Sequence, residues 1–158
     1  MKKEKKQEFT LRITRANKSQ MIVILYDMVL TYLEDSLESF KNKNYKEYKW
    51  NIERAKDCID ELLNSLHMEY EIAGILKGLY FFYKRELTTA AIHNKQEMVL
   101  PVMQMIRELK ESYEQIASQD TSAPIMENTQ EIYAGLTYGK DSLNVNLSDQ
   151  GSHRGFCV

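Results

Sequence analysis

Histidine and cysteine are the side chains most often used for catalysis and metal binding, and this chain has three histidines and two cysteines. Iron sites inside helical bundles use Glu-x-x-His pairs. The residues three positions before the histidines are Asn64, Ala90 and Gln150, so that motif is absent. Cys58 has no histidine at helical spacing, and Cys157, four residues after His153, lies in a polar stretch that is not predicted to be helical, so no Cys-His nucleophile is indicated. The sequence therefore offers no catalytic, cofactor-binding or metal-ligating residue, and we expect a protein that is not an enzyme.

The composition predicts a soluble, single-domain protein that does not bind nucleic acid. The chain has 158 residues, and its 21 basic and 23 acidic side chains give a net charge of −2. These charges are mixed along the sequence, without the basic stripe that nucleic-acid binding requires. Two widely separated cysteines favour reduced thiols over a disulfide framework, which indicates the cytoplasm.

The most apolar stretch is residues 21–33, MIVILYDMVLTYL, in which only Asp27 and Thr31 are polar. A membrane span needs about 20 apolar residues, so this shorter stretch predicts no membrane insertion. The basic start, MKKEKK, lies too far upstream and no small-residue cleavage site follows, so a signal peptide is not indicated. A surface helix normally buries one apolar stripe. This helix is apolar nearly all round, so it is either buried on every side or keeps a second apolar face for something outside the fold.

Four long helices are predicted, because residues that break helices are rare before residue 118. Asn17 or Ser19 can cap the first helix. Pro101 requires that the fourth helix begin shortly before it or bend there. The breaks between helices are short, which forces neighbouring helices to run antiparallel. We therefore expect an all-α, up-down-up-down four-helix bundle with helices at about 17–40, 45–66, 72–90 and 98–116.

The two ends of the chain are predicted to lie outside this bundle, which is expected over residues 17–117. Residues 1–16 form an N-terminal cap segment in this interpretation. Residues 118–158 are polar with scattered apolar side chains, which predicts an irregular C-terminal tail. The alternative for the tail is an extended segment that docks on an apolar groove of the bundle.

A short alternation of apolar and polar residues occurs near both ends. Residues 143–147, Leu-Asn-Val-Asn-Leu, alternate like an extended strand. Phe9, Leu11 and Ile13 alternate in the same way. The N-terminal segment is therefore predicted to act as an extended lid.

Asp27 is a single acid inside an apolar helix, where an ionised carboxylate is costly unless it is paired. Arg54 or Arg85, each on another predicted helix, is the expected partner, and we take Arg85 as the first choice. Such an ion pair would hold the register of the helices. The alternative is that Asp27 contacts a partner chain directly.

The sequence carries more apolar surface than one core needs. Residues 80–83, Tyr-Phe-Phe-Tyr, point about 100° apart in a helix and cannot all face one core. Eight methionines, which adapt easily to different partners, add to this surplus. The first helix has a second apolar stripe, Met21, Ile24 and Met28, which can support a lid or a bound chain. Together these features favour a bundle that receives amphipathic segments in grooves.

The same residues resemble a known family, the flagellin-specific export chaperone FliS. Residues 14–27, ending in Leu-Tyr-Asp, are similar to the signature of the family's first helix. Lys18 stands where the family has proline, Met28-Val29 replace a small Gly-Ala pair, and Tyr113 stands at a usual tryptophan. The four blocks that carry the resemblance, in order, are residues 14–27, 52–66, 79–87 and 106–116.

The resemblance implies a cytoplasmic four-helix bundle that binds the amphipathic C-terminal segment of flagellin. Covering that segment prevents premature polymerisation and aids flagellar type III export. Export-gate or regulatory flagellar proteins are further candidate partners, and no cofactor is implied. The alternative function is a regulatory adaptor that binds another flagellar or translational-control protein.

The resemblance also implies where binding takes place. In the family, the N-terminal segment occupies an apolar groove until flagellin displaces it, and Phe9, Leu11 and Ile13 are the candidates here. The residues expected to contact flagellin are Ile22, Leu25, Tyr26 and Val29 on the first helix, with Tyr80 and Tyr83 on the third.

Overall fold

The computed structural model describes residues 1–126, and the predicted tail from residue 127 onward lies outside the described residues. Within the described part the chain is all-α, with five α-helices, one short 3₁₀ helix and no strand. The predicted all-α class is therefore confirmed for these residues. The helices, in chain order, are α1 (Lys3–Thr14), α2 (Lys18–Lys41), α3 (Tyr45–Asn64), α4 (Glu71–His93), η1 (Gln96–Met98) and α5 (Val99–Gln119).

Local sequence signals explain where these helices begin. The side chain of Asn17 accepts a hydrogen bond from the Gln20 amide at 2.9 Å, and the Gln20 side chain accepts one from the Asn17 amide at 3.0 Å. This reciprocal capping box satisfies two of the free amides at the start of α2. Pro101 lies in the first turn of α5, where its missing amide removes no hydrogen bond. The predicted starts near Asn17 and shortly before Pro101 are both confirmed.

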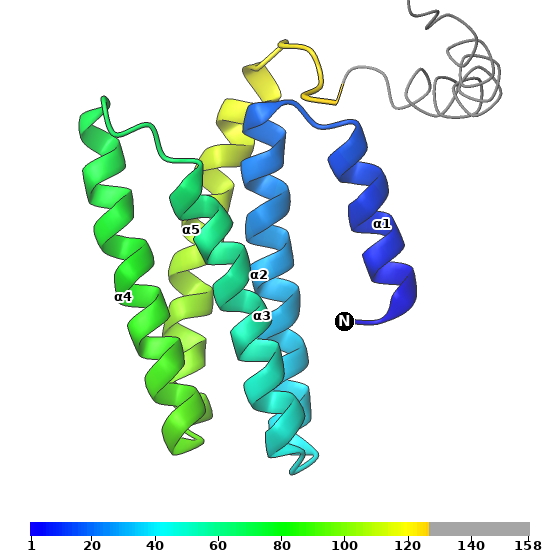
Figure 1. Cartoon of the computed structure of the whole chain (residues 1–158), viewed down its shortest axis with the longest axis vertical. Coiled ribbons are helices and arrows are strands. Elements are labelled where there is room, and N and C mark those ends of the chain that lie inside the picture. The colour runs from blue at the N-terminus through cyan, green and yellow to red at the C-terminus, as the bar shows by residue number, and fades with distance from the viewer. Residues whose placement is uncertain (127–158) are drawn as a thin grey trace, which may run out of the picture. The chain divides into compact units, whose positions relative to one another are not determined.

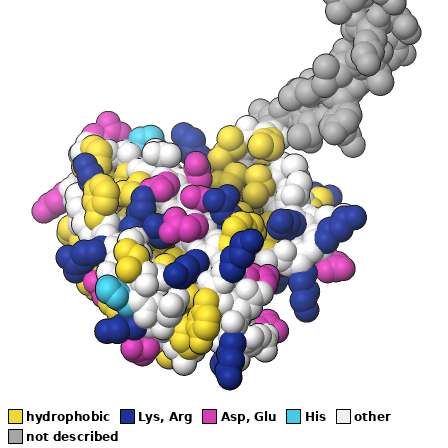
Figure 2. All heavy atoms as spheres, turned by 60° about the horizontal axis from the view of Figure 1, so that its bottom comes forward, with side chains coloured by type: hydrophobic (Ala, Val, Ile, Leu, Met, Phe, Trp, Pro, Cys, Tyr) yellow, Lys and Arg dark blue, Asp and Glu magenta, His cyan; other side chains and the backbone are white. Residues whose placement is uncertain are grey.

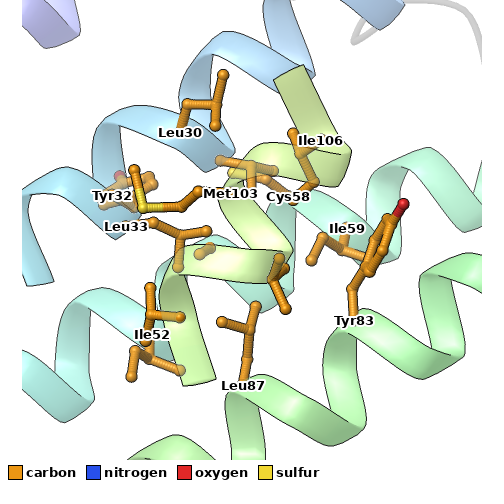
Figure 3. Close-up of a cluster of buried hydrophobic side chains, with 14 of the residues drawn as sticks. Leu30, Tyr32, Leu33, Ile52, Cys58, Ile59, Tyr83, Leu87, Met103 and Ile106 are labelled. Atoms are coloured by element: carbon orange, nitrogen blue, oxygen red, sulfur yellow. The ribbon is translucent and has the colours of Figure 1, made fainter. Parts of the chain in front are cut away.

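A common hydrophobic core holds α2, α3, α4 and α5 together. Figure 1 shows these four helices lying side by side. Leu33 of α2, Ile59 of α3 and Leu87 of α4 are fully buried and point into the same interior (Figure 3). α2 contributes most widely, because it packs against α3, α5 and α1. This apolar helix is therefore covered on several sides but not on every side, since Ile22 and Leu25 remain partly exposed.

The N-terminal segment differs from its prediction. Residues 9–13 are not extended but lie within α1. Phe9 and Ile13 are four residues apart, so a helix places both on one face. That face packs on α2, with Phe9 only 3% exposed, while Leu11 points away and is 54% exposed. Burial of this pair outweighs an alternation that is only five residues long.

The C-terminal boundary also shifts slightly. α5 continues to Gln119, two residues beyond the predicted end of the bundle. Residues 120–126 follow without helix or strand. In the described part of the chain, no helix is both long enough and apolar enough to cross a membrane.

We predict that Leu33→Ala lowers the free energy of unfolding by about 2–5 kcal/mol, because it leaves a cavity in a core where Leu33 is fully buried. Urea unfolding followed by circular dichroism measures this change. The control is Leu100→Ala, at a side chain that is 55% exposed, which should change stability by less than about 0.5 kcal/mol. Equal effects of the two substitutions would contradict the proposed core.

Candidate functional site

A large apolar hollow lies between the first half of α2, the end of α3 and the start of α4. It is a groove of about 770 Å³, within the range of about 300–1,000 Å³ that is usual for ligand sites. Charged and polar side chains, Lys18, Glu61 and His67 among them, stand at its sides. The apolar residues that line this groove, which we call the α2–α4 groove, are Met21, Ile22, Leu25, Leu66, Tyr70, Ile72, Ala73, Leu76, Tyr80, Tyr113 and Ile125.

The structure separates the predicted partner-binding residues into two groups. Ile22, Leu25 and Tyr80 line the α2–α4 groove. Tyr26 and Val29 are fully buried, and Tyr83 is only 1% exposed. The second group therefore forms the core beneath the groove and offers a partner no surface.

Sequence reasoning did not single out the residues at the start of α4. Tyr70 and Ile72 line the groove and remain 61% and 58% exposed. Met68 precedes them and is 57% exposed. The available signal was three large apolar residues that alternate with glutamates in a helix break and the first turn of the next helix. Few core residues lie near such a position to cover them.

Tyr80 and Tyr113 form the floor of the groove, and Tyr26 packs beneath them. The hydroxyls of Tyr26 and Tyr80 share a hydrogen bond at 2.5 Å, and the ring centroids of Tyr26 and Tyr113 are 5.6 Å apart. Burial raises the pKa of Tyr80 to about 12 and the pKa of Tyr26 well above its usual value. These phenols stay protonated at neutral pH, so the floor is uncharged and suits an apolar side chain.

A second apolar surface of α2 is covered by α1. Met21, Ile24 and Met28 pack with Phe9 and Ile13 in a small separate cluster. The guanidinium of Arg12 also lies over the Phe9 ring, 5.5 Å from its centroid. The second stripe of the first predicted helix therefore supports the N-terminal segment.

Asp27 is paired, but not with the predicted residues. Its Oδ2 accepts a hydrogen bond from Arg12 Nη2 at 2.6 Å, and its Oδ1 lies 2.7 Å from Lys110 Nζ. The Asp27 carboxylate, 20% exposed, therefore joins α1, α2 and α5. The hydrogen bond to Asp27 raises the pKa of Lys110, although burial partly opposes it.

The expected pairing of Asp27 with Arg85 or Arg54 is wrong. Arg85 is 71% exposed and contacts Glu86, its neighbour on α4. Arg54 pairs with Asp57 on α3. The reason is the direction of the Asp27 side chain, which faces α1 and α5 rather than α3 and α4.

Residues 120–125, which we call the strap, cross the junction between α1 and α2. The Asn17 side-chain amide donates to the Asp120 carbonyl at 3.0 Å, and the Ser19 hydroxyl donates to the Asp120 carboxylate at 2.5 Å. The Ile125 amide donates to the Ala16 carbonyl at 2.9 Å. The strap thus holds Ile125 at the edge of the α2–α4 groove.

Neither catalysis nor metal binding is indicated among the described residues. No group of three or more His, Cys, Asp or Glu side chains within residues 1–126 could hold a metal ion. Burial raises the pKa of the Cys58 thiol to about 11, so this thiol stays protonated and is a poor nucleophile. The arrangement offers apolar contact area and rim hydrogen bonds, which is the chemistry of a binding site.

Comparison with known proteins identifies the family. The family described as flagellar protein FliS matches residues 1–120. The chain belongs to the FliS family. The flagellar secretion chaperone FliS of Campylobacter jejuni is 24% identical over 106 residues, which are 66% of this chain and 83% of that protein. The flagellar secretion chaperone FliS of Bacillus subtilis is 20% identical over 103 residues, 65% of this chain and 77% of that protein.

The family match extends over α1 to α5 and so includes every wall of the groove except Ile125. In this FliS-family chain the strap therefore begins at the edge of the matched region.

We predict that Ser19→Ala raises the pKa of Asp120 from about 2 toward its ordinary value of 3.8. Hydrogen bonds from Ser122 and Ser19 lower this pKa, and the substitution removes one of the two donors. Because the folded-state pKa is lowered, these bonds are complete above pH 4 and weaken as the pH falls toward 2. Carboxyl NMR titration measures the shift. An unchanged pKa would mean that Ser19 does not contact Asp120, and Ser118→Ala, outside this contact, is the control.

Proposed function

We propose that this protein is a cytoplasmic flagellar secretion chaperone that binds the amphipathic C-terminal segment of flagellin. Binding would prevent premature polymerisation and keep flagellin competent for flagellar type III export. The α2–α4 groove on a chain of the FliS family carries the proposal. The names of the two relatives, both flagellar secretion chaperones, support it.

The fold that goes with this function is an antiparallel up-down-up-down bundle of α2, α3, α4 and α5. Short connections support it, since α2 ends at Lys41 and α3 begins at Tyr45. Consecutive helices joined by so few residues pack antiparallel. The four helices also share one core, as an antiparallel bundle requires.

The groove suits one apolar face of a bound helix. Ile72, Leu25 and Ile22 offer aliphatic surface, while the buried tyrosine floor carries no charge. Burying an aliphatic side chain contributes about 1.5–3 kcal/mol, so a few anchors are enough for specific binding. On the face of the molecule that Figure 2 shows, apolar side chains lie among basic and acidic ones.

The lid in this proposal is α1. Phe9 and Ile13 occupy the second apolar stripe of α2, and Met21 belongs to both that stripe and the groove. A flagellin segment that wraps around α2 would therefore compete with α1. Leu11 points outward and takes no part in docking, although it belongs to the predicted lid.

We predict that Ile72→Ser weakens binding of a flagellin C-terminal peptide at least tenfold, because it removes an aliphatic anchor worth more than about 1.4 kcal/mol. Ile72 is 58% exposed, so the fold should tolerate the change. Isothermal titration calorimetry measures the affinity. The matched control is Leu100→Ser, outside the groove and 55% exposed, which should bind like the unchanged protein.

Flagellin that lacks its C-terminal segment distinguishes a chaperone from a regulatory adaptor. The proposed chaperone does not retain this truncated flagellin. A protein that binds the truncated and complete forms equally well would contradict the proposal.

We predict that Phe9→Ser raises the association rate of the flagellin peptide at least tenfold. Phe9 is 3% exposed and anchors α1, so its loss increases the fraction of protein with an open lid. Stopped-flow fluorescence measures the rate. Leu11→Ser on the same helix is the control, because Leu11 is already exposed. If Phe9→Ser and the unchanged protein associate equally fast, α1 is not a lid.

A further inference from the structure

The side of α4 that faces away from the core carries large apolar side chains. Ala73, Leu76, Tyr80 and Leu87 are buried on the inner side. Figure 1 places α4 at one edge of the described helices. Side chains at helical spacing on the opposite side define what we call the outer face of α4: Glu71, Gly74, Ile75, Gly78, Phe81, Phe82 and Arg85. Phe82 lies at the border of this face, because it also packs partly against the core.

Two of these residues are exposed large hydrophobics without a partner in the fold. Ile75 is 59% exposed and Phe81 is 53% exposed. Single exposed apolar residues are common on protein surfaces. Here they lie six residues apart and flank Gly78, about 60° to either side of it around the helix.

The glycines on this face have no role in packing within the chain. A Cβ atom added at Gly74 or at Gly78 would meet nothing within 4 Å. Glycine is less favourable than alanine inside a helix, so the fold alone gives no reason for either. Their effect is to let another backbone approach α4 closely.

The outer face is complementary to itself. Glu71 and Arg85 lie equally far from Gly78 along the helix, on opposite sides of it. Ile75 and Phe81 are related in the same way, as are Gly74 and Phe82. Two antiparallel copies of α4 crossing at Gly78 would therefore place acid against base, aliphatic against aromatic, and glycine against aromatic.

We propose that the outer face of α4 binds the same face of a second copy of this chain, with the two helices antiparallel and Gly78 at the two-fold axis. Such a contact is isologous, because each residue pair occurs twice. Arg85 is 71% exposed and contacts only Glu86 and the ring of Phe82, both on its own helix, and Glu71 is exposed as well. The pair between copies would take the place of the exposed Arg85–Glu86 contact. Lys84, beside this face, forms an ion pair with Asp60 of α3 and so does not compete for Glu71 of the second copy.

The size of this contact sets its strength. One helix pair buries less than the roughly 1,600 Å² of a standard interface, so a weak, concentration-dependent dimer is expected. The dissociation constant is expected on the order of micromolar. Ala73, Leu76 and Tyr80, through which α4 lines the α2–α4 groove, lie on the opposite, buried side of α4, so the dimer contact does not cover this lining.

Analytical ultracentrifugation of the full chain over a range of micromolar concentrations tests the proposal. The unchanged protein should show a reversible monomer–dimer equilibrium. Gly78→Leu should raise the dissociation constant at least tenfold, because its side chain blocks close approach. The same variant should unfold at a higher denaturant concentration, because leucine favours a helix and meets no neighbour here. Loss of the dimer together with a gain in stability separates this effect from misfolding.

Charge reversal tests the orientation. Glu71→Arg and Arg85→Glu should each weaken the dimer at least tenfold, and the double variant should restore it. Glu111→Arg on α5, which makes the same change in net charge as Glu71→Arg at an exposed position, is the control and should leave the equilibrium unchanged.

Three outcomes would overturn the proposal. The first is a protein that stays monomeric at every concentration. The second is a dimer that Gly78→Leu does not weaken. The third is a flagellin peptide that dissociates the dimer and no longer binds Gly78→Leu, since the outer face would then belong to flagellin rather than to a second copy.

Discussion

The structure depends on burying α2, a helix that is apolar on almost every side. α3 and α5 cover part of its surface and join it in the common core. They leave the stripe of Met21, Ile24 and Met28, which α1 covers. They also leave Ile22 and Leu25, which line the α2–α4 groove. The core, the docked N-terminal helix and the open groove therefore all follow from the excess of apolar side chains on α2.

The strap shows how the ends of the described chain are tied to this helix. Asn17 caps α2 with its carboxamide oxygen and holds the strap with its carboxamide nitrogen. One side chain thus serves both the start of α2 and the edge of the groove. Because the Ile125 amide is hydrogen-bonded to the Ala16 carbonyl in the α1–α2 junction, a movement of α1 that shifts the junction would also move the edge of the groove.

Much of the fold could be predicted from local signals. The cap at Asn17 and the proline at 101 each set a boundary through backbone hydrogen bonding, which depends on near neighbours in sequence. The residues of the candidate site were harder to predict than the fold. Tyr26 and Ile22 are one turn apart on a helix that is apolar all round, so periodicity cannot show that one is core and the other groove. Asp27 can pair with Arg12 because residues 3–14 form the helix α1. The apolar–polar alternation of residues 9–13 did not reveal that helix.

The shared carboxylate of Asp27 has a consequence for how α1 can leave. A buried charge that loses its only partner is strongly destabilising. Asp27 has two partners, and only Arg12 belongs to α1. If α1 detaches, as proposed, Lys110 still pairs with the carboxylate while Arg12 returns to water. Release of α1 would then leave no unpaired charge behind on α2.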